Sequence, residues 1–154
     1  DGLVTGVTVP VAVFYMAVAF VWELKSLDIF AAALAGGLIG FLLFNFHPAR
    51  VFMGDTGSLA LGGAIAGMTM LTRTELLGVI VGGLFVLVVA SSVLQIGWFR
   101  ISGGRRLFKM APLHHHFELM GWGEVTIVTR FWIIAAMFTG LGVGLFYAEW
   151  VAAQ

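Results

Sequence analysis

A polar segment between two long apolar runs, residues 45–58, holds a single carboxylate, Asp55, between Gly54 and Gly57. The glycines leave the backbone open to a ligand, and the start of the following helix offers free N–H groups that suit a phosphate. One carboxylate together with substrate phosphate oxygens is a common ligand set for Mg²⁺. The pattern therefore predicts magnesium-dependent phosphoryl transfer. An equally good interpretation makes Asp55 only an N-cap or a first-turn acid.

Three consecutive histidines, His114, His115 and His116, follow Pro112 in the longest polar stretch. An imidazole can donate a hydrogen bond to phosphate or carry a proton. The alternative is a solvated loop at the membrane interface. We do not expect a zinc site, because adjacent side chains diverge and the chain offers no second set of ligands. The acidic and the histidine-rich segments are predicted to face each other across one pocket.

Other polar or aromatic residues nearby have both a structural and a functional interpretation. Asn45 and His47 either cap the preceding helix or help to order the site. Phe52 either anchors the chain at the interface or stacks on a nucleobase. Gln95 either pairs with another helix or faces a ligand. Four basic residues either hold lipid headgroups or attract a nucleotide diphosphate: Arg50, Arg105, Arg106 and Lys109.

Composition excludes an ordinary soluble domain. The chain is 60% hydrophobic and 10% charged, with a mean hydropathy of +1.04, whereas soluble domains carry about 25% charged residues. The absence of cysteine excludes disulfides and thiolate metal sites. The net charge is zero, so bulk charge gives no reason to expect a nucleic-acid partner.

Five apolar runs are each close to the length that crosses a bilayer, about 17–25 residues. We therefore predict an all-α, polytopic transmembrane bundle with about five spanning helices, forming a single domain over 1–154. The third run is the shortest and is rich in glycine. The runs are Gly2–Trp22, Ile29–Ala49, Thr56–Thr72, Leu76–Phe99 and Phe131–Ala148.

Local signals refine these helices. The first is expected at 7–22, with Pro10 in its first turn, where a missing N–H is harmless. The second, 29–46, should end before Pro48. The third, 58–71, has Thr56 or Ser58 as an N-cap, and the fourth, 76–99, is expected to bend at Gly82. Glycines within 36–40 and 62–67 are expected to let helices pack closely.

The distribution of basic residues predicts the orientation. With Asp1 on the cytoplasmic side, five crossings place only Lys25 and Arg73 outside, which agrees with the positive-inside rule. The remaining six lie inside: Arg50, Arg100, Arg105, Arg106, Lys109 and Arg130. The chain begins on Asp1 without an initiator methionine, so we expect it to be part of a longer protein.

Three segments closely resemble one family, the bacterial phospho-N-acetylmuramoyl-pentapeptide-transferases. They are NFHPARVFMGDTGSLALG at 45–62, MAPLHHHFEL at 110–119 with Gly121 and Trp122, and RFWII at 130–134. The opening Asp1-Gly2-Leu3 is similar to the end of the family's nucleotide-binding turn. These matches are long, ordered and spread over nearly the whole chain.

The resemblance implies transfer of phospho-N-acetylmuramoyl-pentapeptide from its UDP carrier to undecaprenyl phosphate. The products would be lipid I and UMP, and the reaction would be the first membrane step of peptidoglycan synthesis. It would take place with Mg²⁺ on the cytoplasmic face of the bacterial inner membrane. Asp55 would bind the metal, His114 and His115 would line the phosphate and sugar part of the cleft, and His116 would support the loop. Five further residues would contribute to substrate binding: Asp1, Asn45, Phe52, Gln95 and Ala111.

The resemblance also implies what this chain lacks. The family has about ten crossings and a pair of adjacent aspartates in the preceding half, and this sequence has no adjacent aspartates. We therefore expect an N-terminal half as a partner and no activity from this portion alone. A homodimer is left open. Two other functions are kept as alternatives: transfer of N-acetylglucosamine phosphate to a polyprenyl phosphate, for which the histidine pattern differs, and transport through a membrane bundle, whose site would lie near mid-membrane.

Overall fold

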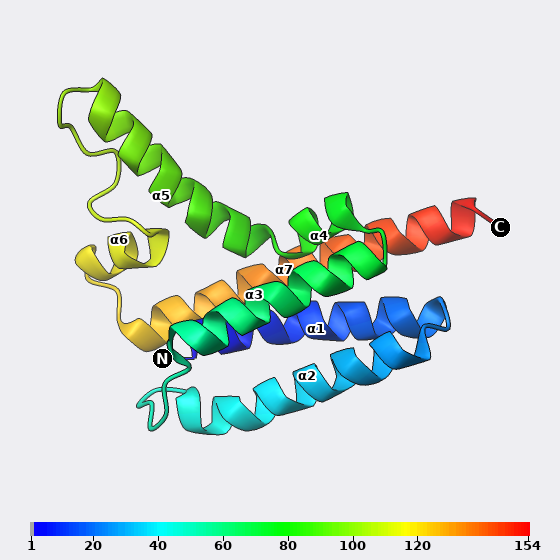
Figure 1. The fold of residues 1–154 in the computed structure, drawn as a ribbon. Helices are drawn as coiled ribbons and strands as arrows, with labels where there is room; N and C mark the ends of the chain where they lie inside the picture. Colours follow the sequence, from blue (N-terminus) through cyan, green and yellow to red (C-terminus); the bar gives the residue numbers. More distant parts are fainter. Residues whose placement is uncertain (1) are drawn as a thin grey trace.

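The computed structural model describes residues 2–154, and within that range the chain is entirely α-helical, without strands (Figure 1). The prediction of an all-α bundle is therefore confirmed. The helices, in chain order, are α1 (Leu3–Val21), α2 (Lys25–Asn45), α3 (Gly54–Leu71), α4 (Glu75–Val81), α5 (Gly83–Ile101), α6 (Leu113–Leu119) and α7 (Glu124–Ala152).

Four of these helices, α1, α2, α5 and α7, are long and apolar enough to cross a membrane. The third expected span forms helix α3, whose 18 residues correspond to about 27 Å of helix. It is not among the candidate spans, so residues 2–154 contain four such helices and not about five. The chain is a polytopic membrane protein, and α3 runs alongside the longer helices in Figure 1.

Several expected helix boundaries were wrong. Helix α1 begins at Leu3, which places Pro10 inside the helix and not in its first turn. Helix α3 begins at Gly54 after Met53 and has no side-chain cap, and the expected cap residues Thr56 and Ser58 lie inside the helix, where Ser58 donates its hydroxyl to the Gly54 carbonyl. Helix α7 begins at Glu124, seven residues before the apolar run. Its 29 residues span about 44 Å, more than the roughly 30 Å of a bilayer core.

The fourth apolar run forms two helices. It breaks at Gly82, as the glycine pair predicted, so that α4 packs along α7 while α5 projects away from the bundle (Figure 1). The backbone of Gly83 lies against the Phe138 ring of α7, and a Cβ at this position would collide with that ring. This turn directs the last part of α5 toward the histidine-bearing α6.

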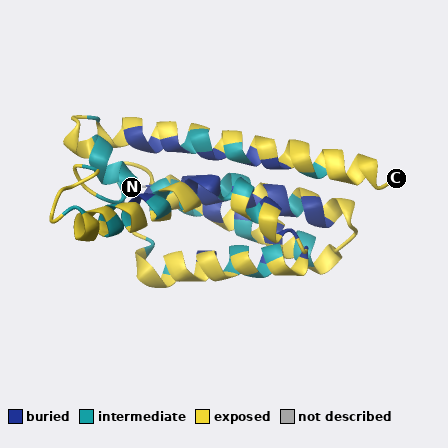
Figure 2. Ribbon diagram, turned by 90° about the horizontal axis from the view of Figure 1, so that it is seen from above, coloured by how far each residue is buried: buried dark blue, intermediate teal, exposed yellow. Residues whose placement is uncertain are grey.

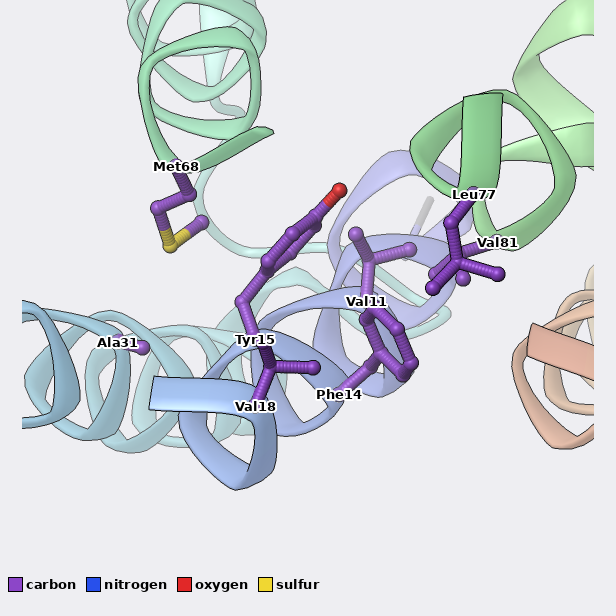
Figure 3. Close-up of a cluster of buried hydrophobic side chains, with 8 residues drawn as sticks. All are labelled: Val11, Phe14, Tyr15, Val18, Ala31, Met68, Leu77 and Val81. Atoms are coloured by element: carbon purple, nitrogen blue, oxygen red, sulfur yellow. The ribbon is translucent and has the colours of Figure 1, made fainter. Parts of the chain in front are cut away.

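Helix α1 is the centre of the molecule. Its apolar window is 56% buried, compared with 11% for α5, and in Figure 2 the buried segments lie along the helix that starts at the N-terminal label. Tyr15 and Phe14 of α1 pack with Met68 of α3 and Val81 of α4 (Figure 3). The fully buried Tyr15 hydroxyl shares a 2.8 Å hydrogen bond with the Thr69 hydroxyl, so this polar group is satisfied inside the bundle.

The glycines that allow close helix packing are not the expected ones. A Cβ at any glycine within 36–40 or 62–67 would meet nothing within 4 Å among the described residues. Gly6 of α1 instead lies against the Trp132 indole of α7, and Gly142 of α7 lies against Val81. These glycines therefore do not mediate close packing within residues 2–154, whereas the alanines Ala31 and Ala35 of α2 are buried.

Both polar segments lie at the same end of the bundle. Figures 1 and 2 show the end of α2, the start of α3, α6 and the start of α7 together at one end. Lys25 begins α2 and Arg73 lies in the turn after α3, both at the other end. The separation of basic residues that was used to predict the orientation is therefore present in the fold.

Candidate functional site

The acidic part of the site is residues 45–58, here called the aspartate segment, and Asn45 anchors it. This side chain is buried at 6% exposure on the last residue of α2. Its Oδ1 accepts hydrogen bonds from the Gly2 backbone N–H at 3.1 Å and the Thr5 hydroxyl at 2.9 Å. Its Nδ2 donates to the Val51 carbonyl at 2.9 Å. One amide thus joins α1, α2 and the loop before Asp55, as its expected ordering role requires.

Asp55 is exposed in the first turn of α3, as one of its two interpretations predicted. No hydrogen bond or ion pair joins its carboxylate to any of residues 2–154, so both oxygens are available to a ligand. The preceding Gly54 has a φ of +68°, a conformation that other residues adopt only with strain. Phe52, in the same loop, is 72% exposed. Its stacking on a base stays a prediction.

The histidine-bearing part of the site is residues 107–119, here called the histidine segment, and α5 holds it through two polar side chains. The Gln95 Oε1 accepts from the backbone N–H groups of Leu107 at 3.1 Å and Phe108 at 2.8 Å, and its Nε2 donates to the Phe108 carbonyl at 3.1 Å. The Ser91 hydroxyl accepts from the Leu113 N–H at 3.1 Å. Gln95 therefore pairs with loop backbone and not with another helix.

An aromatic stack joins α6 to α7. The rings of Phe117 and Trp122 lie parallel with centroids 4.6 Å apart, and the Arg130 guanidinium lies 4.2 Å from the Trp122 ring centroid. Phe117 also meets Phe131 edge to face. Stacked rings and a cation over an indole are each worth about 0.5–1.5 kcal/mol. The short helix α6 is thus held by side chains, although seven residues alone would not form a stable helix.

The three histidines have different surroundings. His116 Nδ1 accepts a hydrogen bond from the Lys109 backbone N–H at 3.0 Å, which joins its ring to the histidine segment. His115 Nδ1 lies 2.8 Å from a Glu118 oxygen. His114 stacks on His115 with centroids 4.2 Å apart, and its Nδ1 is buried without a partner in the described chain. Burial lowers the pKa of His114, His115 lowers it further, and Glu118 opposes both effects.

A cavity of about 180 Å³ lies between α6 and the start of α7. Its polar side chains are His114, His115, Glu118 and Glu124, and apolar residues complete it: Leu3, Ile127 and Val128. Glu124 also reaches the aspartate segment, because its Oε2 lies 3.4 Å from His47 Nδ1. The cavity is therefore next to both polar segments and to the start of α1.

Asp55 does not line this cavity, so the crevice expected between it and the histidines stays a prediction. Within residues 2–154 no group of three or more histidine and acidic side chains is placed to hold a metal ion. Ala111 is half-buried beside Pro112, and its role in substrate binding is untested. Substrate binding by Asn45 and Gln95 is likewise untested; the side-chain amides of both residues form hydrogen bonds within the chain. Asp1 lies outside the described residues.

Sequence reasoning missed two acids, Glu118 and Glu124. Glu118 follows His115 by three residues, a spacing that brings side chains together on a helix. That signal was available, but the segment was expected to be a loop, so it was not used. Glu124 begins α7, and its contact with His47 joins residues 77 positions apart, for which the sequence carries no local signal.

Comparisons with known proteins show which sequences this chain resembles. Residues 1–73 match the family model described as glycosyl transferase family 4. The chain is 55% identical to the phospho-N-acetylmuramoyl-pentapeptide-transferase of Beutenbergia cavernae, over 98% of this chain and 47% of that protein. It is 62% identical to the same-named protein of Renibacterium salmoninarum, over 82% of this chain and 34% of that protein.

A third relative, from Cutibacterium acnes, carries the same name and is 60% identical over 84% of this chain and 36% of its own length. The chain thus spans about half, or less, of the length of these relatives. These matches cover both polar segments, because even the shorter ones leave out less than a fifth of the chain. The chain belongs to the phospho-N-acetylmuramoyl-pentapeptide-transferase family, of whose members it spans a part.

Proposed function

We propose that the protein containing this chain transfers phospho-N-acetylmuramoyl-pentapeptide from UDP to undecaprenyl phosphate, forming lipid I and releasing UMP. The observation that carries the proposal is the 55% identity, over 98% of the chain, to a relative named for this transfer. The geometry supports it, since the aspartate and histidine segments share one end of a membrane bundle. An anionic lipid and a water-soluble nucleotide can meet only at such an end.

The donor set around Asp55 suits Mg²⁺. This ion is commonly held by one or two carboxylates, with substrate phosphate oxygens and water completing its ligands. Asp55 is a free, exposed carboxylate, and the absence of a closed ligand cluster in residues 2–154 leaves room for phosphate. When bound, the ion would neutralise charge on the pyrophosphate during transfer. In our proposal Asp55 is the ligand that this chain supplies.

The histidine segment would bind the phosphate and sugar part of the donor. His114 is kept neutral by its lowered pKa, so its ring can form hydrogen bonds without carrying charge. His115 lines the same cavity, and His116 holds the segment in shape. We propose that Asp1, Phe52, Gln95 and Ala111 border the uridine site, with the exposed Phe52 ring stacking on uracil.

The base that activates the lipid phosphate would come from outside this chain. The sequence has three aspartates, and none is adjacent to another. We therefore propose that an N-terminal half supplies the base and that this chain alone is inactive. The site would face the cytoplasm across the bacterial inner membrane, because six of the eight basic residues belong to the end that carries it.

A transport function would need a polar site near the middle of the membrane. Asp55 instead lies in the first turn of α3, and the histidines lie in α6, outside the four candidate spans. This placement favours chemistry at an interface. Transfer of N-acetylglucosamine phosphate is the remaining alternative, and the same assay can test it with a second donor.

The test is a lipid I assay with the full-length gene product in detergent. Radiolabelled UDP-N-acetylmuramoyl-pentapeptide and undecaprenyl phosphate should give a labelled lipid in the presence of Mg²⁺, and UDP-N-acetylglucosamine should not. Asp55→Asn keeps the shape of the side chain and removes its charge. We expect it to lower kcat by about 10³-fold, the upper range for loss of one electrostatic contact. Unchanged turnover in this variant would end the assignment of Asp55.

A further inference from the structure

Glu118 is placed to control one of the three histidines. Its Oε2 lies 2.8 Å from Nδ1 of His115, one helical turn earlier on α6. A separation of this size is typical of a hydrogen bond that involves a charged group. The two side chains are 38% and 45% exposed, and both line the cavity of about 180 Å³ next to α7. The pair therefore lies at the candidate site and not on a distant surface.

The contact decides which ring nitrogen of His115 carries hydrogen. An ionised carboxylate can only accept, so Nδ1 of His115 must donate to it. In the neutral ring Nε2 then keeps its lone pair, and in the charged ring it carries a hydrogen of its own. In both forms Nε2 is the nitrogen left for a ligand. The carboxylate also restricts rotation of the ring about its bond to the main chain.

The neighbouring histidines show that this arrangement is specific to His115. His116 has the opposite polarity, because its Nδ1 accepts from the Lys109 N–H and its hydrogen must lie on Nε2. The Nδ1 of His114 is buried and has no partner among residues 2–154. Three histidines that are equivalent in the sequence are thus held in three different ways, and only His115 has a carboxylate partner within hydrogen-bond distance in this part of the chain.

We propose that Glu118 is a positioning residue that fixes the tautomer and orientation of His115, so that Nε2 of His115 faces the phosphate groups of the sugar-nucleotide donor. This inference rests on the proposed function and adds a residue to it. Glu118 acts through His115 and does not touch the substrate. Its effect should therefore appear in turnover, disappear when His115 is absent, and be restored by a side chain that still accepts a hydrogen bond.

The kinetic test compares Glu118→Ala with Glu118→Gln in the full-length protein. Removal of a group that orients a reacting side chain costs about 10- to 100-fold. We expect Glu118→Ala to lower kcat by that factor with little change in KM for the donor, and Glu118→Gln to recover most of the loss, because its amide oxygen can still accept from Nδ1. Glu75→Ala, which alters an exposed acid at the start of α4, is the matched control and should leave kcat unchanged.

A double variant separates positioning from general support. Added to His115→Ala, Glu118→Ala should cause no further loss, because the residue on which it acts is gone. Independent, multiplying losses would overturn the proposal, as would a normal kcat in Glu118→Ala. A loss of folding would instead appear as a lower Tm and a smaller active fraction, so both are measured for each variant.

A spectroscopic measurement tests the same contact without relying on activity. Nitrogen-15 spectra of histidine-labelled full-length protein distinguish a protonated from an unprotonated Nδ1, and His115→Asn assigns the signal. We expect Nδ1 of His115 to be protonated in the wild type and in Glu118→Gln, and to lose this preference in Glu118→Ala. A wild-type ring with an unprotonated Nδ1 would overturn the inference. Failure of the wild type to form lipid I would instead remove the proposed function and leave this measurement standing.

Discussion

The aspartate segment and the histidine segment lie at the same end of the bundle but are held in opposite ways. The buried and partly buried side-chain hydrogen bonds of the aspartate segment come mainly from one amide, Asn45, which makes three of them to the start of α1 and to its own loop, beside the more exposed contact of His47 with Glu124. The histidine segment is held by many partly exposed contacts. They come from Gln95, Ser91, His116, and the stack of Phe117 on Trp122.

The difference shows how each segment can present its functional groups. Concentrated anchoring leaves Asp55 free of partners within residues 2–154, so the carboxylate is available to a cation. Distributed anchoring uses the histidines themselves, and two of the three make a hydrogen bond within the chain. The first segment should therefore fail at a single residue, whereas the second should weaken gradually.

The largest effect is expected at the single anchor. Asn45→Ala leaves the Gly2 N–H, the Thr5 hydroxyl and the Val51 carbonyl without their partner in a buried site. Buried groups left unpaired cost about 1–3 kcal/mol each, so we expect a loss of about 3 kcal/mol in the free energy of unfolding. The measurement is unfolding of the full-length protein in mixed detergent micelles.

Thr5→Val is the matched control for this prediction, because it keeps the shape of a fully buried side chain and removes only one of the three bonds. We expect a cost of about 1 kcal/mol. Equal losses in the two variants would show that the aspartate segment is not held mainly through Asn45.

A smaller and more local effect is expected at Gln95. Gln95→Ala removes three contacts to the histidine segment, but Ser91 and the aromatic stack remain. We expect a change of about 1 kcal/mol or less in global stability and a several-fold faster cleavage by trypsin after Arg105 and Arg106. Gln95→Glu keeps the two accepted bonds and should be cleaved at an intermediate rate. A global loss as large as that of Asn45→Ala would contradict distributed anchoring.

The smallest effect is a dependence of stability on pH. The pKa of His114 in the folded chain lies below its ordinary value of 6.5. At a pH between the folded-state pKa and the unfolded-state pKa, the unfolded chain therefore binds more protons than the folded chain. The contribution of neutral His114 to the free energy of unfolding is thus complete above the unfolded-state pKa, and it is lost as the pH falls below that pKa. We expect the wild type to lose stability relative to His114→Gln between about pH 7 and pH 5. Parallel melting curves across this range would show that the histidine is not buried in the neutral form.

The sequence predicted more of the fold than of the contacts within the site. The length and composition of an apolar run are enough to predict a membrane-spanning helix. The glycine pair at 82–83 correctly indicated the break between α4 and α5. Helix starts were wrong at Leu3, Gly54 and Glu124: α1 begins inside its apolar run but before the expected residue 7, whereas α3 and α7 begin in polar residues that precede their runs. The roles that the resemblance implies for Asp1, Phe52 and Ala111 stay predictions.

Residue types and their order determined on their own that this chain crosses a membrane and that a free acid and three histidines lie at its polar turns. These properties depend on transfer of apolar groups from water and on local spacing, which each stretch carries within itself. Only the tertiary structure decided that Asn45 is an anchor and that Glu124 meets His47. Such pairings depend on the relative placement of separate helices, which α1 sets through its buried face.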